Sequence, residues 1–320
     1  MKKTKKILLL NPSHPILQQL LKKAGFVCVE NFSDDKTTIE SIVNDYNGIV
    51  LRSRINIDQA ILNAGDHLSF VAREGAGLEH IDLNYAKEKG IKIISTPAGS
   101  RDTVGEHALG MLLALMNNLC RADQQIRTGV WDREGNRGIE IKGKTVGIIG
   151  YGNMGASFAR KISGFDANVI AYDKFKSNYG DAFATAVDLE TLQREADIIS
   201  LHIPYLPENI HFINDNFLSS CKKDLFIVNT ARGLVLNTED LVKHLQSGNV
   251  KGAALDVIEY EEQSFDSWNF DNLPAPFQYL INAPNVVLAP HIAGWSFESK
   301  ENHARILAQK IIAHLKGKQE

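Results

Sequence analysis

The sequence predicts an α/β protein built from two doubly wound parallel sheets. Three observations support this fold class. Short apolar runs rich in β-branched residues alternate with stretches of helical period along most of the chain. The length of 320 residues exceeds one typical domain, and a hydrophobic content of 44% is enough for two cores. A glycine-rich turn at residues 150–155 joins an apolar run to a helical stretch, as in the first βα unit of a doubly wound domain.

Strands and helices are expected to alternate through the first hundred residues and to form one complete sheet. Each expected strand is a short apolar run, and each expected helix has apolar residues spaced by three or four. The expected strands are residues 7–10, 26–29, 48–51, 69–72 and 92–94, and the expected helices are residues 16–24, 37–45, 58–64 and 84–89.

A second doubly wound domain is expected in the middle of the chain. Its expected strands are residues 145–149, 168–172, 198–202, 225–229, 252–256 and 286–288, and its helices include residues 156–162 and 239–246. A last helix at residues 299–315 follows the final strand, and such a helix commonly packs back on the first domain. We therefore expect one domain of residues 1–100 plus 291–320, and an inserted domain of residues 101–290.

Residues 102–127 are expected to form one long helix. The stretch is apolar nearly all round, so such a helix needs cover on several sides. We expect it to lie buried between the domains or to take part in the subunit interface of a homodimer.

The segment Gly150-Tyr151-Gly152-Asn153-Met154-Gly155 has the spacing of a dinucleotide-binding turn. The first glycine makes the sharp turn, the second lets the backbone approach a pyrophosphate, and the third lets the helix pack closely on the strand. Amides at the helix N-terminus then face the phosphates. The motif by itself is weak, because a chain with 24 glycines also produces such spacings by chance.

Asp173 supports the interpretation of residues 150–155 as a dinucleotide-binding turn. It ends the strand after the glycine-rich helix, about twenty residues on, where a carboxylate can hydrogen-bond the adenosine ribose. A carboxylate there repels a 2′-phosphate, which favours NAD over NADP, although Lys174 and Lys176 lie close enough to keep NADP open. Alternatively, Asp173 only caps its strand.

Composition excludes several classes of protein. Lys and Arg number 35 against 38 Asp and Glu, so no basic field favours nucleic acid or an anionic membrane surface. Cys28, Cys120 and Cys221 are far apart and odd in number, which suits free thiols in a reducing cytoplasm. The apolar run at residues 7–10 is too short for a signal peptide, and the ten histidines show no spacing typical of metal ligands. We expect a cytoplasmic protein whose partners are small molecules and copies of itself.

Charged residues follow three strands of the second domain, at the sheet edge where open α/β sheets bind ligands. Arg232 follows one strand, an acidic cluster from Asp256 to Glu261 follows the next, and His291 follows the last. An arginine in such a place can bind a carboxylate with two hydrogen bonds. Each feature taken alone also has an ordinary explanation as a solvated charge or a hydrogen-bonded histidine.

Together, in this order after the glycines, these segments resemble the D-isomer-specific 2-hydroxyacid dehydrogenase family. The resemblance covers nearly the whole chain and implies a Rossmann NAD-binding domain inserted in a flavodoxin-like substrate domain. The matching segments are residues 75–82 (substrate loop), 103–115 (interdomain and dimer helix), 150–155 (cofactor loop), 229–233 (arginine motif), 256–261 and 290–291.

The resemblance implies a role for each matched residue. Arg232 binds the substrate carboxylate, together with the backbone amides of Ala76 and Gly77. His291 is the acid/base, and Glu261 orients it and stabilises its charged form. Removing a hydride from a secondary alcohol requires a base within reach of the hydroxyl proton, and an imidazole backed by a carboxylate suits that task. The implied cofactor-binding residues are Gly150, Gly152, Asn153, Met154, Gly155, Asp173, His202, Pro204, Thr230, Ala231 and Asp256.

Substrate choice within the family is expected to depend on a second arginine group. Arg52, Ser53 and Arg54 end one strand and Arg73 ends the next, so they can assemble a phosphate site. They resemble the phosphate-binding positions of the family's D-3-phosphoglycerate dehydrogenases, which implies oxidation of 3-phosphoglycerate in serine synthesis. Alternatively, Arg52 and Arg54 form ordinary surface ion pairs.

Some features depart from that pattern and keep other functions open. Glu79 stands where the family usually has aspartate, and residues 263–284 form a long aromatic insertion that could be a lid, a dimer contact or a specificity element. The chain ends at Glu320, so we expect no C-terminal regulatory domain. Alternative substrates are glyoxylate, hydroxypyruvate or D-lactate. From another class, the fold could serve as an NAD-sensing module like the family's corepressors.

Overall fold

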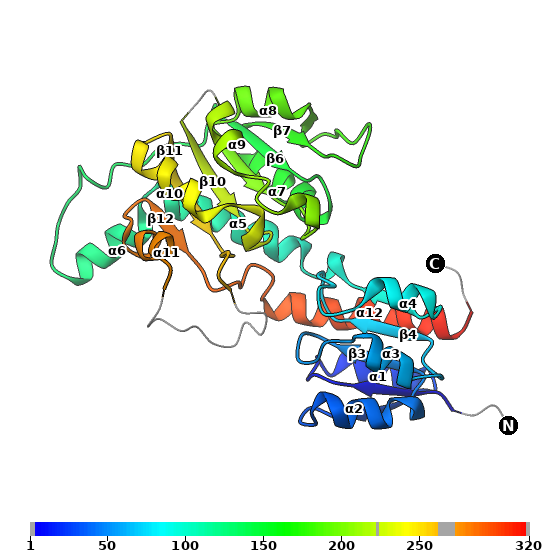
Figure 1. Ribbon diagram of the computed structural model, residues 1–320. Coiled ribbons are helices and arrows are strands. Elements are labelled where there is room, and N and C mark those ends of the chain that lie inside the picture. The colour runs from blue at the N-terminus through cyan, green and yellow to red at the C-terminus, as the bar shows by residue number, and fades with distance from the viewer. Residues whose placement is uncertain (1–3, 222–223, 262–272, 318–320) are drawn as a thin grey trace. The chain divides into compact units, whose positions relative to one another are not determined.

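The computed structural model describes residues 4–221, 224–261 and 273–317, and their contacts divide the chain into two compact units (Figure 1). The first unit comprises residues 1–100 with 295–320, and the second comprises residues 101–294. The expected boundary near residue 290 differs slightly, because His291 lies within the second unit.

The first unit is a five-stranded parallel sheet of strand order β2-β1-β3-β4-β5, which is the flavodoxin-like order. Registers such as Leu8 beside Ile49 and Val50 beside Ala72 align the carboxyl ends of neighbouring strands. Its elements are β1 (Lys6–Leu9), α1 (Ile16–Lys23), β2 (Val27–Glu30), α2 (Lys36–Ile42), β3 (Gly48–Leu51), α3 (Gln59–Ala64), β4 (Phe70–Arg73), α4 (Leu83–Glu88), β5 (Lys92–Ser95) and α12 (Phe297–Leu315).

Alternating side chains of β1 fill two cores, one on each face of this sheet. Ile7 and Leu9 pack with residues of α1 and α12, whereas Leu8 and Leu10 pack with residues of α2, α3 and α4. Figure 1 shows α12, drawn in red at the end of the chain, on the same unit as the blue N-terminal strands. The first unit is thus made from both ends of the chain.

The second unit is a seven-stranded parallel sheet of order β12-β11-β10-β9-β6-β7-β8, which contains the Rossmann order with one more strand. Helix α5 packs across α7 and covers one face. Its elements are α5 (Arg101–Met116), α6 (Leu119–Arg127), β6 (Thr145–Ile149), α7 (Asn153–Ile162), β7 (Asn168–Tyr172), β8 (Thr185–Ala186), α8 (Leu189–Glu195), β9 (Ile198–Leu201), α9 (Asp215–Ser220), β10 (Leu225–Asn229), α10 (Thr238–Ser247), β11 (Val250–Leu255), α11 (Ala275–Asn282) and β12 (Val286–Leu288).

The structure confirms the predicted α/β class with two parallel sheets, but the single long helix expected at residues 102–127 is wrong. The chain breaks at Asn118, whose φ of 54° is left-handed, into α5 and α6. Asparagine tolerates this conformation better than most residues, which explains the break. Only α5 is rich in buried residues, and α6 has none.

Part of the aromatic insertion expected at residues 263–284 belongs to the core of the second unit. Helix α11 lies in it, and Phe277 and Leu280 are buried against the sheet. Residues 262–272, with Trp268 and Phe270, lie outside the described residues.

Candidate active site

The glycine-rich turn between β6 and α7 has the shape that a pyrophosphate requires. Gly150 has a φ of +93°, and a Cβ there would lie 2.7 Å from the His202 carbonyl oxygen. A Cβ on Gly155 would collide with the Gly150 carbonyl, whereas a Cβ on Gly152 would project into open space. A ligand can therefore approach the backbone at Gly152 closely. Helix α7 starts at Asn153, and no side chain caps its N-terminus. The turn fits a dinucleotide.

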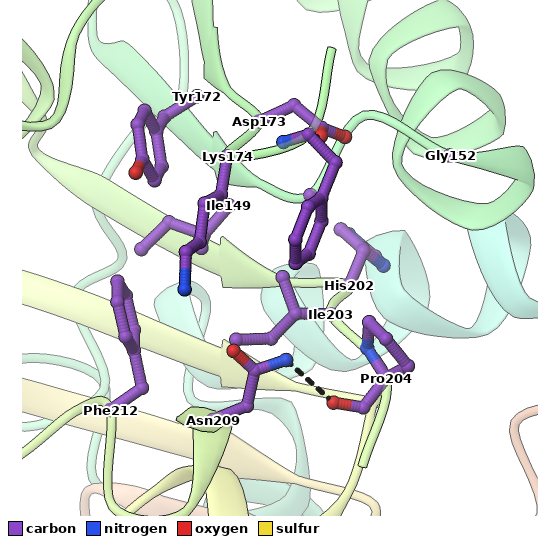
Figure 2. Close-up of a pocket in the computed structure, with 12 residues that line it drawn as sticks. Ile149, Gly152, Tyr172, Asp173, Lys174, His202, Ile203, Pro204, Asn209 and Phe212 are labelled. Carbon is purple, nitrogen blue, oxygen red and sulfur yellow. Dashed lines mark hydrogen bonds between the residues drawn. The ribbon is translucent and has the colours of Figure 1, made fainter. Parts of the chain in front are cut away.

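A pocket lies beside this turn, between the ends of β6, β7 and β9 (Figure 2). Its lining residues are Ile149, Gly150, Gly152, Tyr172, Asp173, Lys174, Phe175, His202, Ile203, Pro204, Asn209 and Phe212. The pocket thus combines apolar walls with the Asp173 carboxylate, as an adenosine site requires. The Asn209 amide donates to the Pro204 carbonyl at 2.9 Å and holds one wall in place.

Asp173 also has a structural role. Its Oδ2 accepts the Tyr151 amide at 2.9 Å, and its Oδ1 accepts the Phe175 amide at 3.0 Å. Each carboxylate oxygen has a second lone pair that can still accept a ribose hydroxyl. Lys176 donates to the Tyr151 carbonyl at 2.6 Å, and the Lys174 ammonium lies 5.5 Å from the Phe175 ring centroid.

Several buried polar atoms, His107 Nε2 among them, have no hydrogen-bond partner within the described part of the chain, and two of them lie just after strands of the second unit. These two are Thr230 Oγ1, just after β10, and His202 Nδ1, just after β9. Burial lowers the pKa of His202 to about 3, so its ring is neutral, and its Nε2 lies 2.9 Å from Ser200 Oγ. Buried polar atoms without partners are rare, and a bound ligand is one explanation.

The arginine motif after β10 is held by its own loop. The fully buried Asn229 accepts the Ala231 amide at 3.0 Å and donates to the Arg232 carbonyl at 3.1 Å. A Cβ on Gly233 would collide with the Ile258 carbonyl, so this loop lies directly against the loop after β11. This loop therefore places the half-buried Arg232 next to the acidic segment at residues 256–261.

His291 and Glu261 form the pair that the sequence predicts. His291 Nδ1 lies 2.7 Å from Glu261 Oε2, and the other carboxylate oxygen accepts the Ile258 amide. His291 Nδ1 donates to this carboxylate when it carries the proton, which leaves Nε2 as the atom that can accept a proton from a substrate. Both side chains are partly exposed, at 25% and 16%.

Asp256 does more than the cofactor contact that the resemblance implies. The residue is fully buried, and its two carboxylate oxygens accept the Ile292 and Ala293 amides, each at 2.8 Å. His107 Nε2 lies 3.3 Å from Oδ1. Burial raises the pKa of Asp256, but His107 and the two amides outweigh burial and hold that pKa below its usual value.

Arg54, in the first unit, makes structural contacts that the sequence did not predict beside its proposed role as a phosphate ligand. Its guanidinium donates to three backbone carbonyls, those of Leu10, Asp34 and Asn31, at 2.5–2.9 Å. These bonds join the loops after β1 and β2 to the loop after β3. The sequence could not show this, because the partners are main-chain atoms of other loops.

Arg52 and Arg73 remain as cations at the ends of β3 and β4, with the half-buried Ser53 after Arg52. The Arg52 guanidinium lies 5.1 Å from the Trp295 ring centroid, a cation–π distance. Burial raises the pKa of the neighbouring Glu74, and the nearby Ser13 hydroxyl and the charges of Arg52, Lys300 and Arg73 oppose this shift. Arg52 and Arg73 thus lie at the ends of neighbouring strands of the first sheet.

The substrate loop at residues 75–77 is tied to the rest of the first unit through Gly75. Its amide donates to Thr96 Oγ1 at 3.0 Å, and Thr96 Oγ1 lies 2.8 Å from His303 Nδ1. The next two amides, of Ala76 and Gly77, have no hydrogen-bond partner in the described ranges, so they can receive a carboxylate. Burial, with the charges of Arg73 and Arg52, lowers the pKa of His303 to about 4.

Sequence reasoning missed His107, Trp295 and the Thr96–His303 contact. His107 had a signal, since it comes directly before the apolar part of its helix at residues 108–116, but its partner lies far along the chain. Trp295 had none.

The comparisons with known proteins agree with this geometry. The family model "D-isomer specific 2-hydroxyacid dehydrogenase, NAD binding domain" matches residues 109–293. A glyoxylate reductase of Thermofilum pendens is 35% identical over 93% of this chain and 88% of its own. A D-3-phosphoglycerate dehydrogenase of Archaeoglobus fulgidus is 34% identical over 86% of this chain and 50% of its own. The crystal structure of an Aquifex aeolicus D-lactate dehydrogenase with NAD and lactic acid has a TM-score of 0.83 at 27% identity, covering 98% of this chain and 96% of that one.

The chain therefore belongs to the D-isomer-specific 2-hydroxyacid dehydrogenases. It is an NAD-dependent oxidoreductase, and its second unit contains the NAD-binding domain. In the part of the chain that the structure describes, no helix is long and apolar enough to span a bilayer.

Proposed function

We propose that this enzyme interconverts a D-2-hydroxy acid and its 2-oxo acid with His291 as the acid/base, Glu261 as its partner and Arg232 as the carboxylate ligand. One observation carries the proposal. The 2.7 Å His291–Glu261 pair and the Arg232 loop lie at the carboxyl ends of adjacent strands, where such sheets bind ligands.

The residues divide the work of the oxidation. Arg232 fixes the substrate carboxylate with its planar fork, with help from the amides of Ala76 and Gly77. His291 Nε2 takes the hydroxyl proton while the C2–O bond becomes a carbonyl, and Glu261 stabilises the imidazolium that forms. NAD, when bound, accepts the hydride from C2. Reduction of the 2-oxo acid is the reverse, with the imidazolium as the proton donor.

We assign the cofactor to the residues around the glycine-rich turn. Gly150, Gly152 and Gly155 with the amides at Asn153 and Met154 hold the pyrophosphate, and Asp173 holds the adenosine ribose. Thr230, Ala231, His202 and Pro204 face the remainder of the dinucleotide, and the two orphaned polar atoms of this group support the assignment.

For the substrate we propose 3-phosphoglycerate, oxidised to 3-phosphohydroxypyruvate in serine biosynthesis. The support is the position of Arg52 and Arg73 at the ends of adjacent strands and the similarity to a D-3-phosphoglycerate dehydrogenase. A second candidate is the reduction of glyoxylate or hydroxypyruvate. It is favoured by the engagement of Arg54 with three carbonyls, which leaves fewer donors for a phosphate, and by the similarity to a glyoxylate reductase.

A substrate panel separates these candidates. The rate of NADH formation or loss is measured with 3-phosphoglycerate, D-glycerate, D-lactate, glyoxylate, hydroxypyruvate and 3-phosphohydroxypyruvate, each with NAD(H) and NADP(H). The proposal predicts the highest kcat/KM for the phosphorylated pair with NAD(H). A higher value for hydroxypyruvate than for its phosphate ester selects the second candidate, and inactivity of a folded sample toward all of them contradicts the oxidoreductase role in favour of an NAD-sensing module.

We also propose a cytoplasmic homodimer that pairs through α6 and the segment after it. Apolar side chains there are exposed, which suits a subunit interface. They are Leu119, Ile126, Val130, Trp131 and Ile139. Light scattering with size-exclusion chromatography tests this: Ile126→Asp is expected to give a monomer, and an unchanged mass contradicts the assignment.

A further inference from the structure

His291 has a strained backbone conformation that hydrogen bonds to Asp256 hold in place. Its φ of 54° is left-handed, a conformation uncommon for residues other than glycine. The His291 amide donates to the Asp256 carbonyl at 2.8 Å, and the next two amides donate to the Asp256 carboxylate. Three successive amides of the loop, from His291 to Ala293, are therefore bound by Asp256 alone.

Asp256 needs a further partner to stay ionised in this place. A fully buried carboxylate is costly unless charged or polar groups surround it. Two backbone amides supply part of that stabilisation, and the imidazole of His107 adds an electrostatic contact, because its buried Nε2 lies 3.3 Å from Oδ1 and has no hydrogen-bond partner among the described residues. Oδ1 is also the oxygen that accepts the Ile292 amide, so His107 acts on the same atom that holds the loop.

His107 reaches this atom from a rigid support. Helix α5 is anchored by buried residues on either side of His107, such as Val104, Ala108 and Met111. Its side chain is 23% exposed, which leaves little freedom of orientation. A shift of the imidazole therefore requires a shift of the helix.

We propose that His107 is a positioning residue for catalysis: through Asp256 it holds the loop that presents His291 to Glu261. The inference rests on the proposed role of His291 as acid/base. His107 itself makes no contact with the reacting atoms in this scheme. It sets the angle and distance of an imidazole that must meet its proton within hydrogen-bond reach, where small misplacements cost a large part of the rate.

A pair of matched substitutions separates positioning from mere packing. The amide nitrogen of glutamine can occupy the place of the histidine Nε2, whereas the shorter asparagine reproduces only the Nδ1 place. His107→Gln should keep kcat within about 3-fold, and His107→Asn should lower kcat about 10-fold or more with KM for NAD changed less than about 2-fold. Glu106→Gln, a neighbouring α5 residue whose side chain is 72% exposed, serves as the control and should leave kcat unchanged.

A spectroscopic readout on the protein without nucleotide makes the test independent of turnover. An imidazole N–H bonded to a carboxylate gives a downfield proton resonance, which is assigned to His291 by its loss in His291→Asn. That resonance should persist in His107→Gln and should weaken or move in His107→Asn. Equal kcat values and an unmoved resonance in both His107 variants overturn the inference, as does a loss of thermal stability alone.

The same set of variants shows which proposal has failed. Full activity of His291→Asn contradicts the proposed function itself. An inactive His291→Asn together with a fully active His107→Asn contradicts only the role of His107.

Discussion

The carboxyl edges of the two sheets both carry charged residues, yet they hold them in different ways. In the second unit, hydrogen bonds between side chains and loop backbone hold each group: the Asn229 amide binds the Arg232 carbonyl, the Ile258 amide binds Glu261, and the Asp256 carboxylate binds the loop of His291. In the first unit, Arg54 donates three of its five N–H groups to loop carbonyls, while the Arg52 guanidinium lies over the exposed ring of Trp295. The side chains at the edge of the second unit are thus held in one geometry, whereas those at the edge of the first unit are less constrained.

This difference has a functional meaning. Relatives named for glyoxylate, phosphoglycerate and D-lactate share the family of this chain. These acids share the reaction at C2 and differ in the group that C2 carries, so one edge can serve the shared reaction and the other can bind the variable group. We infer that the second unit determines the chemistry and the first unit determines the choice of substrate. Variants at the two edges should then differ in kind.

The largest effect is expected from Arg232 in the second unit. Arg232→Ala should lower kcat/KM about 100-fold or more for every 2-hydroxy acid tested, because two charged hydrogen bonds to the shared carboxylate are lost. Arg232→Lys keeps the charge without the fork and should recover only part of the loss. Steady-state kinetics on two substrates checks this, and a loss confined to one substrate would place Arg232 in substrate selection instead.

A selective effect is expected from Arg52 in the first unit. Arg52→Ala should lower kcat/KM for 3-phosphoglycerate about 10-fold to 100-fold and leave unphosphorylated substrates nearly unchanged, since only the phosphate loses a charged partner. Arg54→Ala is the matched comparison. It should lower the free energy of unfolding by about 1–3 kcal/mol, because three carbonyls lose their donor, without changing the ratio of the two substrates. The opposite pattern, with selectivity lost in Arg54→Ala, would reverse the two assignments.

The smallest effect is expected in acid, because each unit has a histidine whose pKa lies well below its usual value. The folded pKa values of about 3 for His202 and about 4 for His303 lie below the usual value of 6.5, mainly because of burial. The unfolded chain therefore binds these protons first, so their contribution to stability is complete above pH 6.5 and is lost as the pH falls toward 4 and then 3. Melting temperatures from pH 7 to pH 4 should fall less steeply in His303→Gln than in the unchanged protein. An identical slope would mean that His303 does not contribute.

Much of the candidate site could be predicted from the sequence, because the carboxyl ends of parallel strands lie at one edge of the sheet. The order of Arg232, Glu261 and His291 after β10, β11 and β12 was enough to predict their neighbourhood, since those strands are adjacent. The break at Asn118 was readable in principle from the Asn117-Asn118 pair. The sequence does not predict the partners of Arg54 or the contact of His107 with Asp256. These contacts depend on the paths of loops and on how one helix lies over a sheet.

The central claim is that His291 is the acid/base, and the second unit contains its own control. His211 Nε2 lies 2.5 Å from Glu259 Oε1, so the described part of the unit offers a second histidine–glutamate pair, whose glutamate precedes Glu261 by two residues. The most direct measurement is kcat for His291→Asn and His211→Asn, with thermal stability recorded for both. His291→Asn should lose about 100-fold to 10,000-fold in kcat while remaining folded, and His211→Asn should keep kcat within about 3-fold. Comparable activity of the two variants would contradict the account.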